Sequence, residues 1–144
     1  MDGITMGKVL VPAMIENLDD LFRAKKGELP ESEVRRVEVT DALVDTGAFG
    51  LLMPQRMVDH LGLDPVRTRM SRTVSGLLPI TTYRAVRLTI QGRDYVTDVA
   101  GVSDELPVII GQLPLEAMDW VVDLKAQKLI GNPAHGGEEM VDLL

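Results

Sequence analysis

The sequence predicts an all-β domain with short helices, because short strand-like segments alternate with turn residues along most of the chain. Ser75-Gly76 and Gln91-Gly92 each separate two such segments and are typical of hairpin turns. Val108-Ile109-Ile110 is a continuous apolar run, as expected of a strand buried on both faces. The strands expected around the two turns span residues 68–74, 77–83, 85–90 and 93–100.

The other elements follow from capping and breaking residues. Asn17 is a suitable N-cap for a short helix that ends at Gly27, and residues 28–33 resemble an inserted connection. Pro54 fits the first turn of a helix over 55–61 that Gly62 closes. The remaining expected elements are strands at 7–15, 37–44, 121–124 and 128–130 and one or two helical turns at 114–118. We therefore expect a single domain over residues 1–144, with its core at 9–130 and an irregular surface tail at 131–144.

Composition excludes several classes of function. The net charge of −7 and the pI near 4.8 argue against nucleic-acid binding, which needs a basic face. The chain has no cysteine, and its two histidines, His60 and His135, share no ligand spacing, so neither a metal site nor another cofactor is expected. No export signal and no membrane-spanning run are visible, so the default expectation is a soluble cytoplasmic protein.

Asp45 is the strongest candidate for chemistry. It ends the expected strand over 37–44, within Val44-Asp45-Thr46-Gly47-Ala48. Backbone amides after a strand can hold a carboxylate, Gly47 permits a sharp turn and a close approach, and the Thr46 hydroxyl can brace the turn. A carboxylate that ends a buried strand costs several kcal/mol if it is unpaired, which favours a functional role. The tripeptide Asp-Thr-Gly by itself is more often an ordinary turn than a catalytic motif.

The order of motifs gives this tripeptide a context. Asp-Thr-Gly-Ala at 45–48 precedes the hairpin tip at Ser75-Gly76, then Val108-Ile109-Ile110-Gly111, a Pro-started helix and a final strand pair. In this order the chain resembles retropepsin-like (clan AA) aspartic peptidases, and the bacterial non-viral members more than the viral ones. The resemblance covers about residues 9–130. It implies a closed, barrel-like acid-protease fold that forms a C2 homodimer.

The resemblance also implies a mechanism and a set of site residues. One Asp-Thr-Gly motif per chain supplies one carboxylate, so a symmetric dimer is needed to bring two Asp45 residues together around a water. The implied function is that of an aspartic endopeptidase that acts on peptide or protein substrates. The alternative is a dimer of the same fold, with little turnover, used for binding or assembly. The implied catalytic residues are Asp45, Thr46 and Gly47, and the implied substrate-binding residues are Ala48, Val74, Ser75, Gly76, Leu77 and Ile109.

Two positions depart from the viral pattern. Many viral members place Asp after Asp-Thr-Gly-Ala and Arg after the glycine of the apolar triplet, and these two residues pair. Here the positions hold Phe49 and Gln112. Both charged partners are missing together, so no charge is left unpaired. The departure bears on substrate preference and on support for the dimer.

Overall fold

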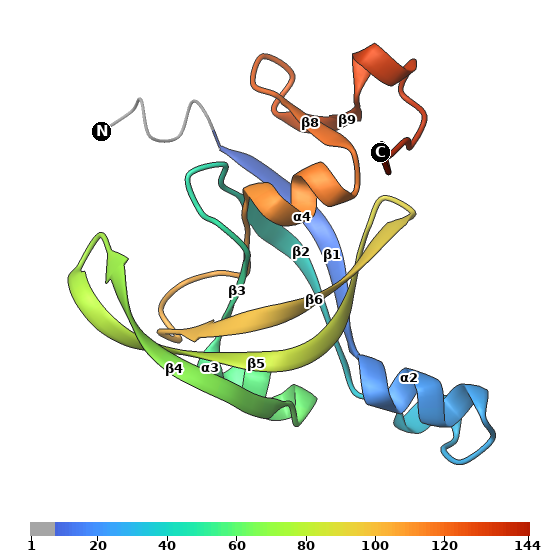
Figure 1. Cartoon of the computed structure of the whole chain (residues 1–144), viewed down its shortest axis with the longest axis vertical. Coiled ribbons are helices and arrows are strands. Elements are labelled where there is room, and N and C mark those ends of the chain that lie inside the picture. The colour runs from blue at the N-terminus through green and yellow to red at the C-terminus, as the bar shows by residue number, and fades with distance from the viewer. Residues whose placement is uncertain (1–7) are drawn as a thin grey trace.

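A computed structural model describes residues 8–144, and its main feature is a β-sheet that closes on itself (Figure 1). The strands are β1 (Val9–Asn17), β2 (Arg36–Val44), β3 (Leu51–Pro54), β4 (Asp64–Thr73), β5 (Gly76–Ile90), β6 (Arg93–Val102), β7 (Ile109–Ile110), β8 (Trp120–Asp123) and β9 (Lys128–Gly131). The helices are α2 (Leu18–Lys25), α3 (Gln55–Leu61) and α4 (Gln112–Ala117), with 3-10 turns η1 (Glu31–Glu33) and η2 (Pro133–His135).

Strand pairing explains the closure. Neighbouring strands run in the order β1-β2-β7-β3-β6-β5-β4, and β1 also pairs with β5 through Met14–Thr89 to Asn17–Val86. This additional pairing closes six of the strands into a barrel and leaves β4 outside it, on the edge of β5. The predicted mostly-β fold with short helices and a closed barrel is confirmed.

The barrel interior is aliphatic, as the shortage of aromatic residues requires. Alternate residues of β5 point inward, and Val86, Leu88 and Ile90 are completely buried. Ile15 of β1, Met53 of β3 and Ile110 of β7 are equally inaccessible. Since each barrel strand contributes to one shared core, closure fixes the ends of all six strands relative to one another.

Several predicted boundaries are wrong. The expected strands at 77–83 and 85–90 form one strand, β5, because the chain bends through a register shift between Tyr83 and Val86 instead of ending there. β3 was not anticipated, since its four residues pair only with distant strands. Pro54 is the last residue of β3 and the N-cap of α3, not part of the first helical turn. β4 begins at Asp64, four residues before the expected start.

Other local predictions are confirmed. The Asn17 side chain caps α2 by accepting from the Asp20 amide, and α3 occupies the predicted range and ends at Gly62 in the left-handed conformation. α4 starts at Gln112, two residues before the expected start. The strand expected at 7–15 is confirmed over residues 9–15, but β1 begins at Val9 and continues to Asn17, and Gly7 lies outside the described residues.

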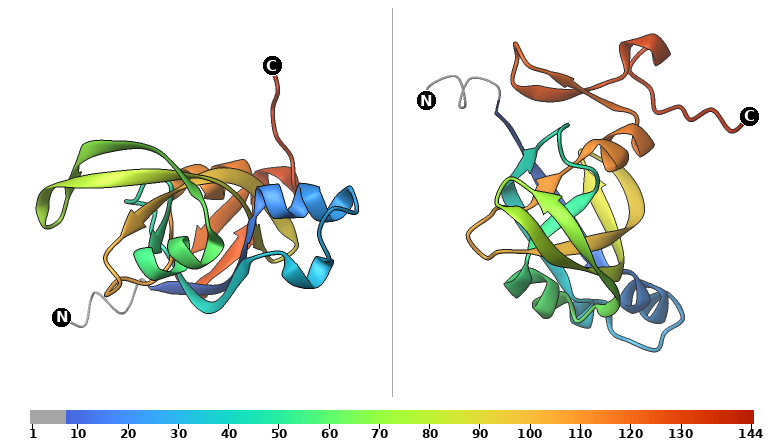
Figure 2. Two further views of the ribbon diagram at one scale, coloured as in Figure 1. Left: turned by 90° about the horizontal axis from the view of Figure 1, so that it is seen from below. Right: turned by 60° about the vertical axis from the view of Figure 1, so that its left-hand side comes forward.

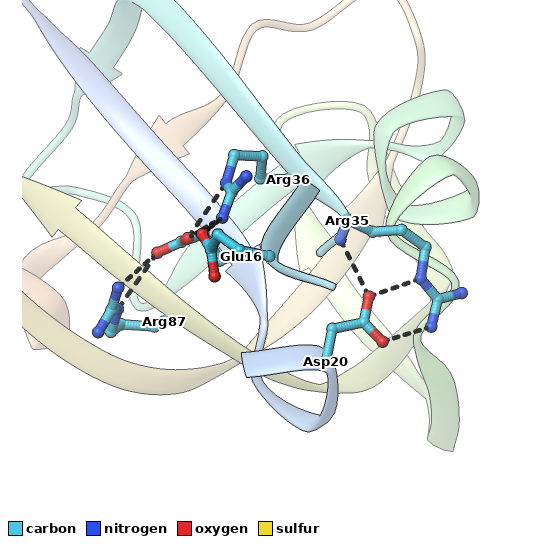
Figure 3. A network of polar contacts seen from close by, with 6 residues as sticks. Glu16, Asp20, Arg35, Arg36 and Arg87 are labelled. Carbon is cyan, nitrogen blue, oxygen red and sulfur yellow. Dashed lines mark hydrogen bonds and ion pairs between the residues drawn. The ribbon is translucent and has the colours of Figure 1, made fainter. Parts of the chain in front are cut away.

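A network of arginines and carboxylates fastens α2 and η1 to the barrel (Figure 3). Glu16 is 2% exposed and accepts from Arg87 through Oε1 at 2.8 Å and from Arg36 through Oε2 at 2.9 Å. Asp20 is also buried and accepts from both the main chain and the guanidinium of Arg35. The fold converts these residues into ion pairs that compensate two buried carboxylates.

The C-terminal segment is more ordered than expected. β8 and β9 form a separate two-stranded sheet at one end of the barrel (Figure 2). Behind it, the buried carboxylate of Asp119 accepts from the side chains of Asn132 and His135 and from the Met140 amide. The prediction of an irregular tail is wrong for η2, because these hydrogen bonds hold residues 132–140 in place.

Candidate active site

Asp45 directly follows β2, and the sheet holds that strand end from both sides. Val44 pairs with Val9 of β1 and with Ile110 of β7. The Asp45 amide continues this pairing by donating to the Ile110 carbonyl at 3.0 Å. The backbone that carries the carboxylate is therefore part of the barrel wall, although the side chain itself is exposed.

The carboxylate is oriented by main chain alone. The Gly47 amide donates to Asp45 Oδ1 at 2.9 Å. A Cβ at Gly47 would lie 3.1 Å from the same oxygen, so glycine is favoured by this close approach and not by a left-handed backbone. Among the described residues, no cationic side chain pairs with Asp45. The expectation that the strand buries this aspartate is wrong for the single chain.

The loop after Asp45 is fastened to the start of α4. The Ala48, Phe49 and Gly50 carbonyls accept from the amides of Gln112, Leu113 and Gly111 at 2.9, 2.9 and 2.8 Å. These three bonds join the loop over 45–50 to the start of α4.

Gly111 is the residue that allows this contact. A Cβ there would lie 2.6 Å from the carbonyl oxygens of both Ala48 and Gly50, closer than real Cβ atoms come. Because both neighbours are backbone, they cannot rotate away. The sequence showed only that a glycine follows the apolar triplet, and the structure supplies the reason.

Thr46 and Phe49 face outward from the same loop. Both are exposed, Phe49 at 78%, which is unusual for an aromatic side chain. The Thr46 hydroxyl has no hydrogen-bond partner within residues 8–144, so it does not brace its own turn. Beside Thr46 is a hollow lined by residues of α4 and β8, among them Gln112 and Trp120. The buried Trp120 Nε1 is without a partner in the described part of the chain.

The other predicted site residues lie in two places. Ile109 is half-buried in β7, where it pairs with Leu43 two residues before Asp45. The exposed tip of the β4–β5 hairpin, which projects from the barrel, consists of Val74, Ser75, Gly76 and Leu77. The tip is a tight turn in which the Thr73 hydroxyl accepts from the Ser75 amide and donates to the Gly76 carbonyl, and Gly76 has a φ of 104°.

The β4–β5 hairpin extends from the barrel on the side that carries the β2–β3 loop (Figures 1 and 2). The structure therefore unites Asp45, Thr46, Gly47, Ala48 and Ile109 at one end of β2 and β7. It places the hairpin tip on a separate projection.

The described residues contain no cluster of side chains suited to binding a metal ion. Across residues 8–144, no three His, Asp or Glu side chains gather in an arrangement suited to a metal ion. His135 contacts Asp119, and the His135 ring holds the pKa of that carboxyl below its usual value. His60 is exposed on α3. None of the helices within residues 8–144 has the length and apolar character required to cross a bilayer.

Together, the barrel and the strand-end Asp-Thr-Gly define the class as a retropepsin-like aspartic protease fold. The family model described as aspartyl protease matches residues 32–113, which include Asp45, the hairpin and Gly111. The chain belongs to this aspartyl protease family of the retropepsin-like clan. No curated protein sequence matches the chain.

Proposed function

We propose that the protein is an aspartic endopeptidase whose active form is a homodimer with two Asp45 residues at its centre. The observation that carries this proposal is the state of Asp45 in the single chain. The carboxylate is exposed, has no cationic partner among the described residues and projects from a loop that three hydrogen bonds join to the start of α4. Family membership supports a peptide substrate.

The need for a second copy follows from the chemistry. A single carboxylate cannot act as base toward water and at the same time hold a proton for the scissile carbonyl. Two carboxylates about 3 Å apart share one proton, because the doubly ionised pair is repulsive. Rotation about a twofold axis near Asp45 supplies the second group without a second motif in the chain.

The surface around Asp45 is consistent with such an axis. Thr46 and Phe49 are exposed next to the carboxylate. A partner surface would cover the Phe49 ring and offer an acceptor to the Thr46 hydroxyl. In the dimer, the two Thr46 side chains would brace the pair of catalytic loops.

The proposed reaction needs only a peptide and water. The ionised Asp45 takes a proton from the water as the water oxygen bonds to the scissile carbonyl carbon. The protonated Asp45 donates to the carbonyl oxygen, which gives a neutral gem-diol. The C–N bond then breaks as the leaving nitrogen receives the proton that the first Asp45 took from water, and a gem-diol hydroxyl returns a proton to the second Asp45 as the carboxylic acid product forms. The hairpin tip at Val74–Leu77, with Ala48 and Ile109 near the loop, would line the peptide.

An acid-pH digest of a peptide library, with and without a statine-type transition-state inhibitor, tests the activity. We expect inhibitor-sensitive cleavage, and specific activity that falls on dilution as the dimer dissociates. Full activity from a strict monomer would contradict the shared site. A stable dimer that cleaves no peptide would instead favour a binding or assembly role.

A further inference from the structure

The hairpin arm, defined as residues 65–84, has a charge opposite to that of the rest of the molecule. It contains Arg67, Arg69, Arg72 and Arg84 and no acidic residue. Because the whole chain carries −7 and the arm carries +4, the remaining residues carry −11. This contrast follows the fold, since β5 pairs with β6 only from Thr82 onward and most of the arm extends beyond that point, outside the barrel (Figure 1).

The arm arginines are free, unlike most arginines elsewhere. All four are exposed, and none of their guanidinium groups forms an ion pair or hydrogen bond with another described residue. Outside the arm, ion pairs involve Arg35, Arg36, Arg56 and Arg87. The arm is therefore a cationic surface without internal compensation.

The strand register assigns Arg72 to the inner face of the arm. Tyr83 packs against the barrel core, and Leu77 lies on the same face because it is six residues earlier in the same strand. Arg72 is directly opposite Leu77, and Met70 is opposite Pro79, so these side chains share that face. Met70 and Leu77 are 64% and 61% exposed. The inner face thus combines one guanidinium with two uncovered apolar side chains.

Arg67 and Arg69 lie on the opposite face, and β4 is the outer edge of the sheet. Its outward N–H and C=O groups can pair with an extended segment. An extended segment paired with β4 would have Arg72 on the inner face of the arm and Arg67 and Arg69 on the opposite face. On the inner face it would also contact Met70 and Leu77.

We propose that the arm selects acidic peptide segments, in which Asp or Glu lies within a few residues of the apolar residue bound near Leu77. The proposal rests on the peptidase function for its biological meaning, but binding is measurable without cleavage. A nucleic acid fits the arm less well, because the arginines are divided between two faces and do not form one continuous basic surface along which a phosphate backbone could lie.

The binding experiment uses the full-length Asp45→Asn protein and a labelled peptide with apolar and acidic residues. The comparison peptide has Asn and Gln in place of Asp and Glu. By fluorescence anisotropy at low salt we expect the acidic peptide to bind about tenfold or more tightly, with the preference shrinking as salt screens the charges. The triple variant R67Q/R69Q/R72Q should lose the preference, and Arg72→Gln alone should weaken acidic binding about two- to fivefold.

The matched control, R23Q/K25Q/K26Q, removes the same number of positive charges from the exposed C-terminal end of α2. This variant should keep the preference for the acidic peptide. Equal binding of the two peptides, or equal loss in the control, would overturn the proposal and leave the arginines as protection of an edge strand. Tighter binding of a single-stranded oligonucleotide than of the acidic peptide would also overturn it.

Wild-type kcat/KM on the same peptides separates this inference from the proposed function. Acid-selective binding without any cleavage would contradict the peptidase function and leave the arm assignment intact. Cleavage without a preference for acidic peptides would support the peptidase function and overturn the arm assignment.

Discussion

The two ends of the β1–β2 strand pair treat a carboxylate in opposite ways. At one end, where Glu16 pairs with Arg36 in the register, the Glu16 side chain is buried and accepts hydrogen bonds from two guanidinium groups. At the other end, where Val9 pairs with Val44, the next residue Asp45 is exposed and accepts from one backbone amide.

This difference separates stability from chemistry. A buried carboxylate must be paired, and its pairing is then part of what holds the fold together. A carboxylate that reacts needs at least one oxygen free of strong partners. Such a carboxylate is therefore oriented by backbone amides, without ion pairs to side chains. Changes at the two ends should therefore affect different measurements.

The largest effect is expected at Asp45. Asp45→Asn removes the base and the shared proton, so kcat/KM should fall by about 10²–10⁴-fold. The free energy of unfolding of the single chain should change by no more than about 0.5 kcal/mol, because the side chain is exposed. Peptide cleavage and urea unfolding of both proteins check this. A wild-type cleavage rate would contradict the assignment of Asp45.

The reverse pattern is expected at Glu16. Glu16→Gln leaves two guanidinium groups without their buried anion, so the protein should lose about 3 kcal/mol of unfolding free energy. The matched control is Glu31→Gln, since Glu31 also binds Arg36 but is 74% exposed at its side chain. The control should cost less than about 1 kcal/mol in the same urea titration. Equal losses would mean that burial of Glu16 is unimportant.

Gly111 bears on both stability and the proposed activity, because it lies against the loop over residues 45–50 from inside the fold. Gly111→Ala should cost about 1–3 kcal/mol and also lower kcat/KM, since the Ala48 and Gly50 carbonyls must move. Gly50→Ala is the control in the same loop, where a Cβ meets nothing within 4 Å. Thermal unfolding and cleavage assays should leave the control near wild type. A tolerant Gly111→Ala variant would show that the loop can shift without loss.

The smallest effect concerns pH. Hydrogen bonds from Arg35 hold the pKa of Asp20 below its usual value, so the folded state takes up a proton there less readily than the unfolded state. The ion pair thus stabilises fully above the unfolded pKa of about 3.9 and is lost as the pH falls through the lowered folded pKa. Asp20→Asn should be less stable at pH 7 and should decline less steeply below about pH 5.

Unfolding midpoints from pH 7 to pH 3 measure this, with the exposed neighbour in Asp19→Asn as the control. A parallel decline in wild type and the Asp20 variant would mean that other carboxylates, such as Asp119, dominate the acid response.

The sequence by itself determined the features that depend on neighbouring residues. Asn17 as a cap, Gly62 as a helix end and Ser75-Gly76 as a turn are set within a few residues of each position. The Asp-Thr-Gly motif was recognisable for the same reason, and with the order of the other motifs it indicated the family that the match over 32–113 shows.

The tertiary structure decided whatever depends on partners that are distant in the chain. Closure of β1 on β5 determines that β5 is continuous and brings Arg87 to Glu16, 71 residues away. The approach of α4 to the loop over residues 45–50 leaves no space for a side chain at Gly111. The exposure of Asp45 was likewise invisible, because burial is a property of the packed neighbours around a residue and not of the strand in which it stands.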